Sequence, residues 1–141
     1  MAQKYEVLRD VAQSLVFRKS VPPGESGYID CDITAHGFVR SVRIRFAAGE
    51  NGTLHIRPVI ILPGNILLDL FKYAQGGDTY VSGDDETVIS DVKMEVENNT
   101  IARVYYENLG EEGTTDSVVN VDIEVEYYTI IEPVNIIGPQ G

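Results

Sequence analysis

Apolar and polar residues alternate along much of the chain with the two-residue period of a β-strand. From Val119 to Tyr128, valine, isoleucine and tyrosine alternate with asparagine, aspartate and glutamate, so one face is apolar and the other acidic. Residues 92–97 show the same alternation, and residues 101–106 form a further β-rich run. Glycine and proline interrupt these runs at short intervals, which is typical of sandwiches and barrels. The pattern therefore predicts an all-β fold, an antiparallel β-sandwich.

A further pair of strands flanks the Asn51-Gly52 turn. A three-residue loop would place Gly52 in the left-handed conformation and would pair residues 42–48 with residues 54–60 as a hairpin. This pairing predicts six inward-facing side chains, which are Val42, Phe46, Ala48, Leu54, Ile56 and Ile60.

The outer face of the same pair would carry Arg43, Arg45 and Arg57, with Arg45 directly opposite Arg57. Like charges in such positions repel each other, so this register requires carboxylates nearby. The acidic face of the last predicted strand offers three of them, which are Asp122, Glu124 and Glu126. The basic and acidic rows can meet within one sandwich or across a subunit interface, where they would contribute more to specificity than to affinity.

The two ends of the chain differ from the central part. Residues 1–16 place apolar side chains at helical spacing, which fits a short helix, and an extended arm is the alternative. The tail at residues 130–141 is apolar, and its two prolines argue against a helix or a central strand. We expect the sandwich domain at residues 17–129. The tail either covers this domain or docks on a neighbouring subunit through Ile130, Ile131, Val134, Ile136 and Ile137.

The composition fits one folded domain, with 141 residues of which 43% are hydrophobic. The formal net charge of −11 is uneven, because residues 1–73 carry +2 and residues 74–141 carry −13. This acidic balance argues against nucleic acid and anionic membranes as partners, since both attract lysine and arginine. No signal peptide follows Met1 and no apolar run is long enough to cross a bilayer, so we expect synthesis in a cytoplasm.

Residue types that carry chemistry occur without a recognisable motif. Cys31 is the single cysteine, which excludes a disulfide framework and predicts a small buried side chain on a strand. His36 and His55 have no nucleophile or ligand motif beside them. Two acidic loops match no calcium motif and are interpreted as solvated turns; their acids are Asp78, Asp84, Asp85, Glu86, Glu111, Glu112 and Asp116. The sequence therefore predicts a protein that is not an enzyme and holds no metal or cofactor.

The tyrosines support one alternative function, a carbohydrate-binding, lectin-like β-sandwich module. Such a module would stack a glycan on exposed aromatic rings. The chain has no tryptophan, and its best exposed candidates are Tyr73, Tyr80 and Tyr128.

Several segments resemble small jelly-roll structural proteins from the virions of tailed bacteriophages. The resemblance lies in residues 19–30 (KSVPPGESGYID), 38–46 (FVRSVRIRF) and 52–58 (GTLHIRP), and it continues through residues 83–87 and 119–128. It implies a jelly-roll sandwich that forms a homo-oligomer, with a trimer favoured, beside other proteins of the capsid or tail. It also implies location in the virion after synthesis in a bacterial host cytoplasm, and it transfers no catalytic residue.

Overall fold

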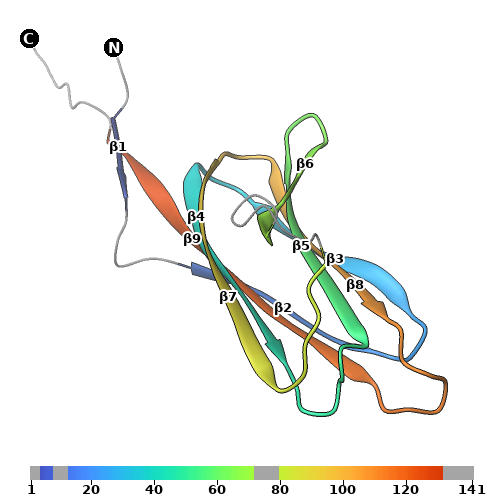
Figure 1. Ribbon diagram of the computed structural model, residues 1–141. Coiled ribbons are helices and arrows are strands. Elements are labelled where there is room, and N and C mark those ends of the chain that lie inside the picture. The colour runs from blue at the N-terminus through green and yellow to red at the C-terminus, as the bar shows by residue number, and fades with distance from the viewer. Residues whose placement is uncertain (1–3, 8–12, 72–79, 132–141) are drawn as a thin grey trace, which may run out of the picture.

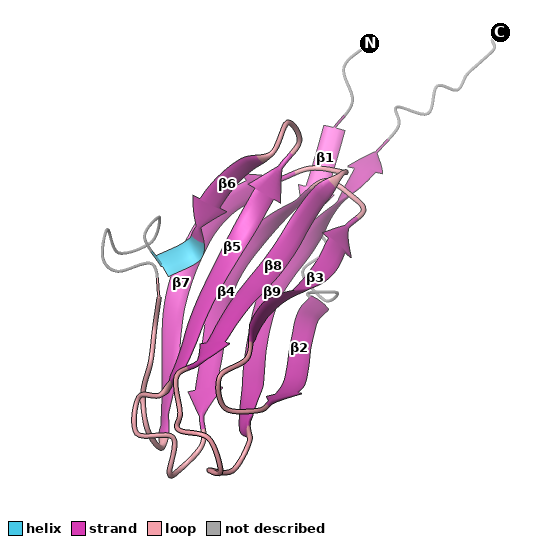
Figure 2. Ribbon diagram, turned by 90° about the vertical axis from the view of Figure 1, so that its right-hand side faces the viewer, coloured by secondary structure: helices cyan, strands magenta, loops and turns pink. Residues whose placement is uncertain are grey.

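The computed structural model describes residues 4–7, 13–71 and 80–131, with side chains over residues 13–71 and 80–128. Nine strands make up most of these residues (Figures 1 and 2). In chain order they are β1 (Lys4–Val7), β2 (Gln13–Val21), β3 (Ser26–Ile33), β4 (Gly37–Phe46), β5 (Leu54–Leu62), β6 (Ile66–Asp69), β7 (Glu86–Val96), β8 (Thr100–Asn108) and β9 (Ser117–Ile131).

The strands form two antiparallel sheets that pack face to face. One sheet has the order β2-β9-β4-β7, with β1 paired to β9 beyond the start of β2, and the other has the order β3-β8-β5-β6. From β2 onward, successive strands alternate between the sheets except at the β5–β6 hairpin. Eight strands in two sheets connected in this way form a jelly roll. The predicted all-β sandwich is therefore confirmed, and its topology is that of a jelly roll.

The inward faces of both sheets form one hydrophobic core. Val119, Val121, Ile123 and Val125 of β9 are fully buried, as their alternation with acidic residues predicts. The side chains predicted to face inward around the Asn51-Gly52 turn are buried as well, with the exception of Ala48, which is exposed.

The hairpin predicted at this turn is wrong in its strand pairing. β4 pairs with β7 and β9, whereas β5 pairs with β6 and β8, so the two strands lie in opposite sheets. The turn itself forms, because Asn51 and Gly52 have φ angles of 50° and 75° and the Thr53 amide donates to the Glu50 carbonyl at 2.9 Å. Alternation determines which face of a strand is buried but not which strand lies beside it. A wrong pairing therefore still placed most of these side chains on the correct face.

The N-terminal helix considered for residues 1–16 is wrong wherever the structure describes this segment. Lys4–Val7 pairs with the end of β9, and Gln13–Val16 opens β2. The sandwich strands thus begin at Gln13, before the boundary expected at residue 17, and β9 continues to Ile131. β9 is 15 residues long, and backbone pairing of both segments along its edge outweighs a weak helical spacing.

β1 and the end of β9 project together from one end of the sandwich, and we call this pair of strands the β1–β9 ribbon (Figures 1 and 2). The β4–β5 and β8–β9 loops lie at the opposite end (Figure 1). Within the described residues, no helix has the length and apolar character needed to cross a membrane.

Candidate functional site

The acidic row of β9 meets the basic residues of β4 within one chain. Asp122 binds two arginines, Arg18 of β2 at 3.1 Å and Arg43 of β4 at 3.0 Å. The strand order β2-β9-β4 explains the arrangement, because β9 lies between the two strands that supply the arginines. Arg43 and Asp122, both predicted as interface residues, are therefore ion-paired within the chain.

The other two predicted acids of β9 also find partners on β4. Arg40 donates to Glu126 at 2.6 Å, and the Ser41 hydroxyl donates to Glu124 at 3.3 Å. A β-bulge between Val39 and Ser41 shifts the register of β4 against both of its neighbours. A bulge re-aims side chains locally, and here it leaves Arg40 on the exposed face beside Glu126.

The predicted row of three arginines does not exist as a row. Arg45 pairs with Asp85 at 2.7 Å, whereas Arg57 lies on the other sheet and donates two hydrogen bonds to Asp69. The hydrogen bonds to Asp69 raise the pKa of Arg57. The placement of Arg45 opposite Arg57 was a consequence of the wrong hairpin register.

We predict that Asp122→Asn lowers the free energy of unfolding by about 1 kcal/mol, since each exposed ion pair contributes about 0–1 kcal/mol. The variant would also leave Arg18 and Arg43 as neighbouring like charges. Denaturant unfolding at low salt measures the effect, and added salt should reduce it. Glu112→Gln, in an exposed loop, controls for the loss of one negative charge. Equal effects of the two variants would contradict a specific role for Asp122.

The outer face of the other sheet carries a second cluster, which sequence patterning did not reveal. Arg103 donates two hydrogen bonds to Asp30, at 2.6 and 2.9 Å, and a third to the Tyr105 hydroxyl. Its guanidinium lies 3.9 Å from the ring centroid of the exposed Tyr28. Tyr28 and Asp30 of β3 lie more than 70 residues from Arg103 of β8, so only the tertiary register of the β3–β8 pairing brings them together.

The first acidic loop supports the β4–β5 turn. Asp84 accepts hydrogen bonds from the amides of Gly49 and Asn51, at 2.8 and 3.1 Å, and Asp85 pairs with Arg45. Asp78 lies outside the described residues. Over the described residues, no three histidine, cysteine, aspartate or glutamate side chains gather in a way that could hold a metal ion.

The aromatic residues considered for glycan binding are spread over the molecule. Tyr80 lies beside His55, with ring centroids 6.2 Å apart, and Tyr128 lies beside His36 and donates to Glu95 at 3.0 Å. Tyr73 lies outside the described residues. Tyr80 and Tyr128 contact different residues, so they do not form one shared surface on which a glycan could stack.

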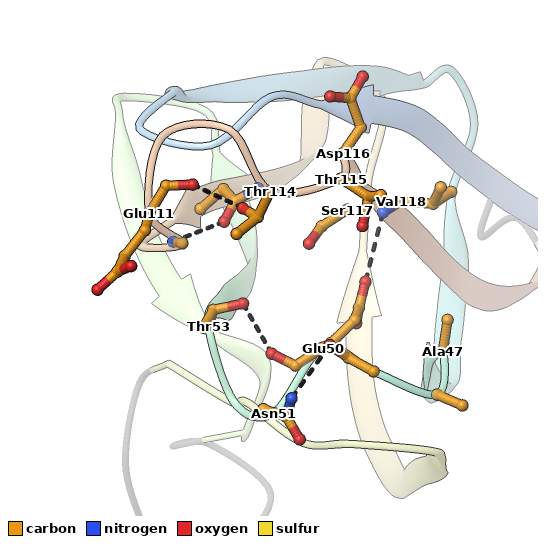
Figure 3. Close-up of a pocket in the computed structure, with 14 residues that line it drawn as sticks. Ala47, Glu50, Asn51, Thr53, Glu111, Thr114, Thr115, Asp116, Ser117 and Val118 are labelled. Atoms are coloured by element: carbon orange, nitrogen blue, oxygen red, sulfur yellow. Dashed lines mark hydrogen bonds between the residues drawn. The ribbon is translucent and has the colours of Figure 1, made fainter.

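A cavity of about 440 Å³ lies between the β4–β5 and β8–β9 loops (Figure 3). Glu50 lies against it with only 7% of its surface exposed. Its Oε2 atom accepts a long hydrogen bond of 3.4 Å from the Val118 amide, and its Oε1 atom is buried without a hydrogen-bond partner. No sequence signal marked Glu50, because a glutamate between Gly49 and Asn51 reads as an exposed turn residue.

Burial raises the pKa of Glu50 above its ordinary value of 4.5, and nearby amides and the Ser117 hydroxyl offset only part of the rise. A raised pKa means that the folded state binds this proton more tightly than the unfolded state does. Ionised Glu50 therefore destabilises the fold above its folded-state pKa, and this penalty disappears as the pH falls to the ordinary value.

We predict that Glu50→Gln is more stable than the original protein at neutral pH and that this advantage vanishes on acidification. Thermal unfolding of both proteins across a pH series measures the difference. Glu112→Gln again serves as the control for charge. An advantage that does not change with pH would show that ionisation of Glu50 is not its cause.

The β1–β9 ribbon contains part of the predicted docking tail. Ile130 and Ile131 pair with Tyr5 and Lys4 of β1. The remaining tail residues predicted to dock, Val134, Ile136 and Ile137, lie outside the described residues.

The chain resembles solved structures but no known sequence family. No protein-family model matches the chain, and no curated protein matches its sequence. A matching solved structure is described as "Structure of infectious bursal disease virus Gx strain", with a TM-score of 0.47 and 9% sequence identity. The match covers 92% of this chain, which spans about a third (32%) of the matched chain.

Proposed function

We propose that this chain is a non-enzymatic structural protein that assembles with copies of itself as a virion component. Its jelly-roll fold is one that recurs in viral capsid domains, although it also occurs in lectin domains and cupins. Because a fold alone does not define a function, the proposal rests on one feature of this chain, the β1–β9 ribbon.

The ribbon is supported on one side only within the described residues. Pairing of β9 with β4 ends at Tyr127, and the last contact on that side is the hydrogen bond from the Tyr128 amide to the His36 carbonyl. Beyond it, β9 pairs with β1 alone. Two strands without a third are marginally stable in water, and their free edges offer backbone donors and acceptors to another chain. A second copy that adds a strand to the ribbon would supply a third strand and would pair with the free backbone groups.

The described side chains also favour a structural role over catalysis. Ion pairs and ring contacts on the outer faces engage most of the charged residues discussed above. Cys31 is half-buried on β3, and burial followed by the charge of Asp32 raises its pKa, which is the opposite of what an activated thiol needs. His36 and His55 contact tyrosine rings.

The finer assignment follows the sequence resemblance to tailed-phage virion proteins. It favours a trimer on the capsid or tail, assembled with other virion proteins after synthesis in the host cytoplasm. The formal net charge of −11 disfavours nucleic acid, which attracts basic surfaces, so protein surfaces are the partners we propose.

We predict that the double variant Tyr5→Pro, Glu6→Pro abolishes self-association. Proline removes backbone donors and is tolerated poorly in a paired strand, and two successive prolines affect both edges of β1. Size-exclusion chromatography with light scattering should show the unmodified chain as an oligomer and the variant at the 15.6 kDa monomer mass. Thermal unfolding of the sandwich should change little, because its strands begin at Gln13.

The matched control, Tyr5→Phe with Glu6→Gln, keeps both backbone amides and should remain oligomeric. An oligomer that survives the proline substitutions would contradict assembly through the β1–β9 ribbon.

A further inference from the structure

The sheet that contains β9 has two long edges, formed by β2 on one side and β7 on the other (Figure 2). Over the described residues, β2 pairs only with β9 and β7 pairs only with β4, so each strand leaves one backbone edge unpaired. β2 has nine residues and β7 has eleven, and neither strand contains a proline or a glycine. A long edge of this kind is a template for strand addition by another chain.

The two edges carry opposite charge. β2 contains two cations, Arg18 and Lys19, and no acid, so its formal charge is +2. β7 contains three acids and one lysine, which gives −2. The edges of the other sheet are both acidic, because β3 contains two aspartates and β6 one, and neither strand contains a cation. Charge complementarity therefore favours contact between the β2 and β7 edges, whereas the β3 and β6 edges would repel each other.

Lys19 and Glu86 leave charge available for a partner on these two edges. Lys19 is exposed, and within the part of the chain that the structure describes it forms no ion pair, whereas Arg18 is bound to Asp122. Glu86 is exposed as well, and its carboxylate accepts one long hydrogen bond of 3.3 Å from the Asp84 amide. A contact between the two edges would bring these opposite charges together.

Exposed apolar side chains also lie at the same level on both edges. Val16 of β2 lies opposite Asp122, which lies opposite Arg43. Arg43 in turn lies opposite Ile89 of β7, so one row of paired residues across the sheet joins Val16 to Ile89. Val16 is 56% exposed and Ile89 is 59% exposed. The sheet thus ends in an apolar side chain at each end of the same row.

We propose that a second copy of this chain docks its β2 edge along the β7 edge and continues the sheet. Neighbouring strands of this sheet are antiparallel, so the added β2 is antiparallel to β7 as well. A copy at the same level places Val16 against Ile89 and, three residues further along, Lys19 against Glu86. The contact joins unlike edges, so it repeats from copy to copy and closes into a ring where the rotation allows. It rests on the self-assembly proposed above but uses a surface other than the β1–β9 ribbon.

Disulfide cross-linking between copies tests this register. Within one chain Val16 and Ile89 are three strand spacings apart, about 14 Å, whereas a disulfide needs Cα atoms about 4.4–6.8 Å apart. The variant Val16→Cys, Ile89→Cys, with Cys31→Ala to remove the native thiol, therefore forms this bond only between copies. After mild oxidation we expect covalent dimers and larger multiples on a non-reducing gel, and their loss on reduction.

Three controls define which edges meet and in which register. Each new cysteine alone, in the Cys31→Ala background, should give no cross-link, because the contact joins unlike edges. An equal mixture of the Val16→Cys and Ile89→Cys single variants should give covalent dimers and nothing larger. Val16→Cys combined with Thr87→Cys should give far less product, because position 87 lies about 7 Å further along the same face of β7.

Exchange of charge gives a second, independent measurement. Lys19→Glu places two acids opposite each other and should weaken self-association about threefold or more at low salt. Glu86→Lys added to the same chain reverses both charges and should restore the original association. Sedimentation velocity across a concentration series measures the three proteins. An association that Lys19→Glu leaves unchanged, or that the added Glu86→Lys does not restore, would contradict the edge contact.

The outcomes separate this contact from assembly through the ribbon. An oligomer that gives no cross-link between positions 16 and 89, or that cross-links equally well through position 87, would overturn the edge contact and leave the ribbon standing. A cross-linked oligomer that survives the Tyr5→Pro, Glu6→Pro substitutions would support the edge contact and contradict the ribbon. A chain that stays monomeric at every concentration, without cross-links, would contradict both.

Discussion

Replacing Phe17 by alanine should lower the free energy of unfolding by about 3–5 kcal/mol, the usual cost of removing a large aromatic side chain from a core. Phe17 is 1% exposed and belongs to the core cluster between the two sheets. Small domains have total stabilities of about 5–15 kcal/mol, so this loss would be a large fraction of the total. Denaturant unfolding followed by circular dichroism measures it.

Val16→Ala provides a matched control on the same strand. Val16 is adjacent to Phe17 but is 56% exposed on the outer face of β2, so its truncation should cost less than about 1 kcal/mol. Similar losses from the two variants would contradict the assignment of residues 13–21 to a sandwich strand with one buried face.

Asn108→Asp should destabilise the fold by about 3 kcal/mol or more. Asn108 is 2% exposed, and its amide nitrogen donates to the Val21 carbonyl at 2.9 Å while its side-chain oxygen accepts from the Gly110 amide at 2.8 Å. An aspartate keeps the second bond but cannot donate the first. The substitution removes the side-chain donor to the Val21 carbonyl, which costs about 1–3 kcal/mol, and places a charged carboxylate at a buried position.

Asn108→Ala separates these two contributions. It removes both side-chain hydrogen bonds but buries no charge, so it should be less damaging than Asn108→Asp. Thermal unfolding of the three proteins at neutral pH gives the order. An aspartate variant as stable as the original would show that Asn108 does not join the end of β2 to the β8–β9 loop as described.

The strands and their buried faces were largely predictable because they depend on local alternation. The acidic and apolar rows of β9 follow directly from the order of residues 119–127. Strand pairing was less accessible, since the same alternation fits any neighbour whose inward face is apolar. The hairpin predicted between residues 42–48 and 54–60 failed for this reason, although the turn that joins them has the predicted left-handed Gly52.

The same distinction between local pattern and strand pairing applies to the interaction residues. The match between Arg43 and Asp122 was predictable as complementary charge on outer faces, although the sequence left open whether it forms within one chain. The Arg103–Asp30 pair and the cavity beside Glu50 were not predictable, because each depends on two segments that meet only in the folded sandwich. A buried glutamate in a turn rich in glycine and asparagine has no distinguishing sequence pattern.

The mass of the unmodified chain in solution tests the central claim, which is self-assembly through the β1–β9 ribbon. Sedimentation velocity across a concentration series should give a species whose mass is a whole multiple of 15.6 kDa, with three copies expected. A single 15.6 kDa species at every concentration would contradict the claim.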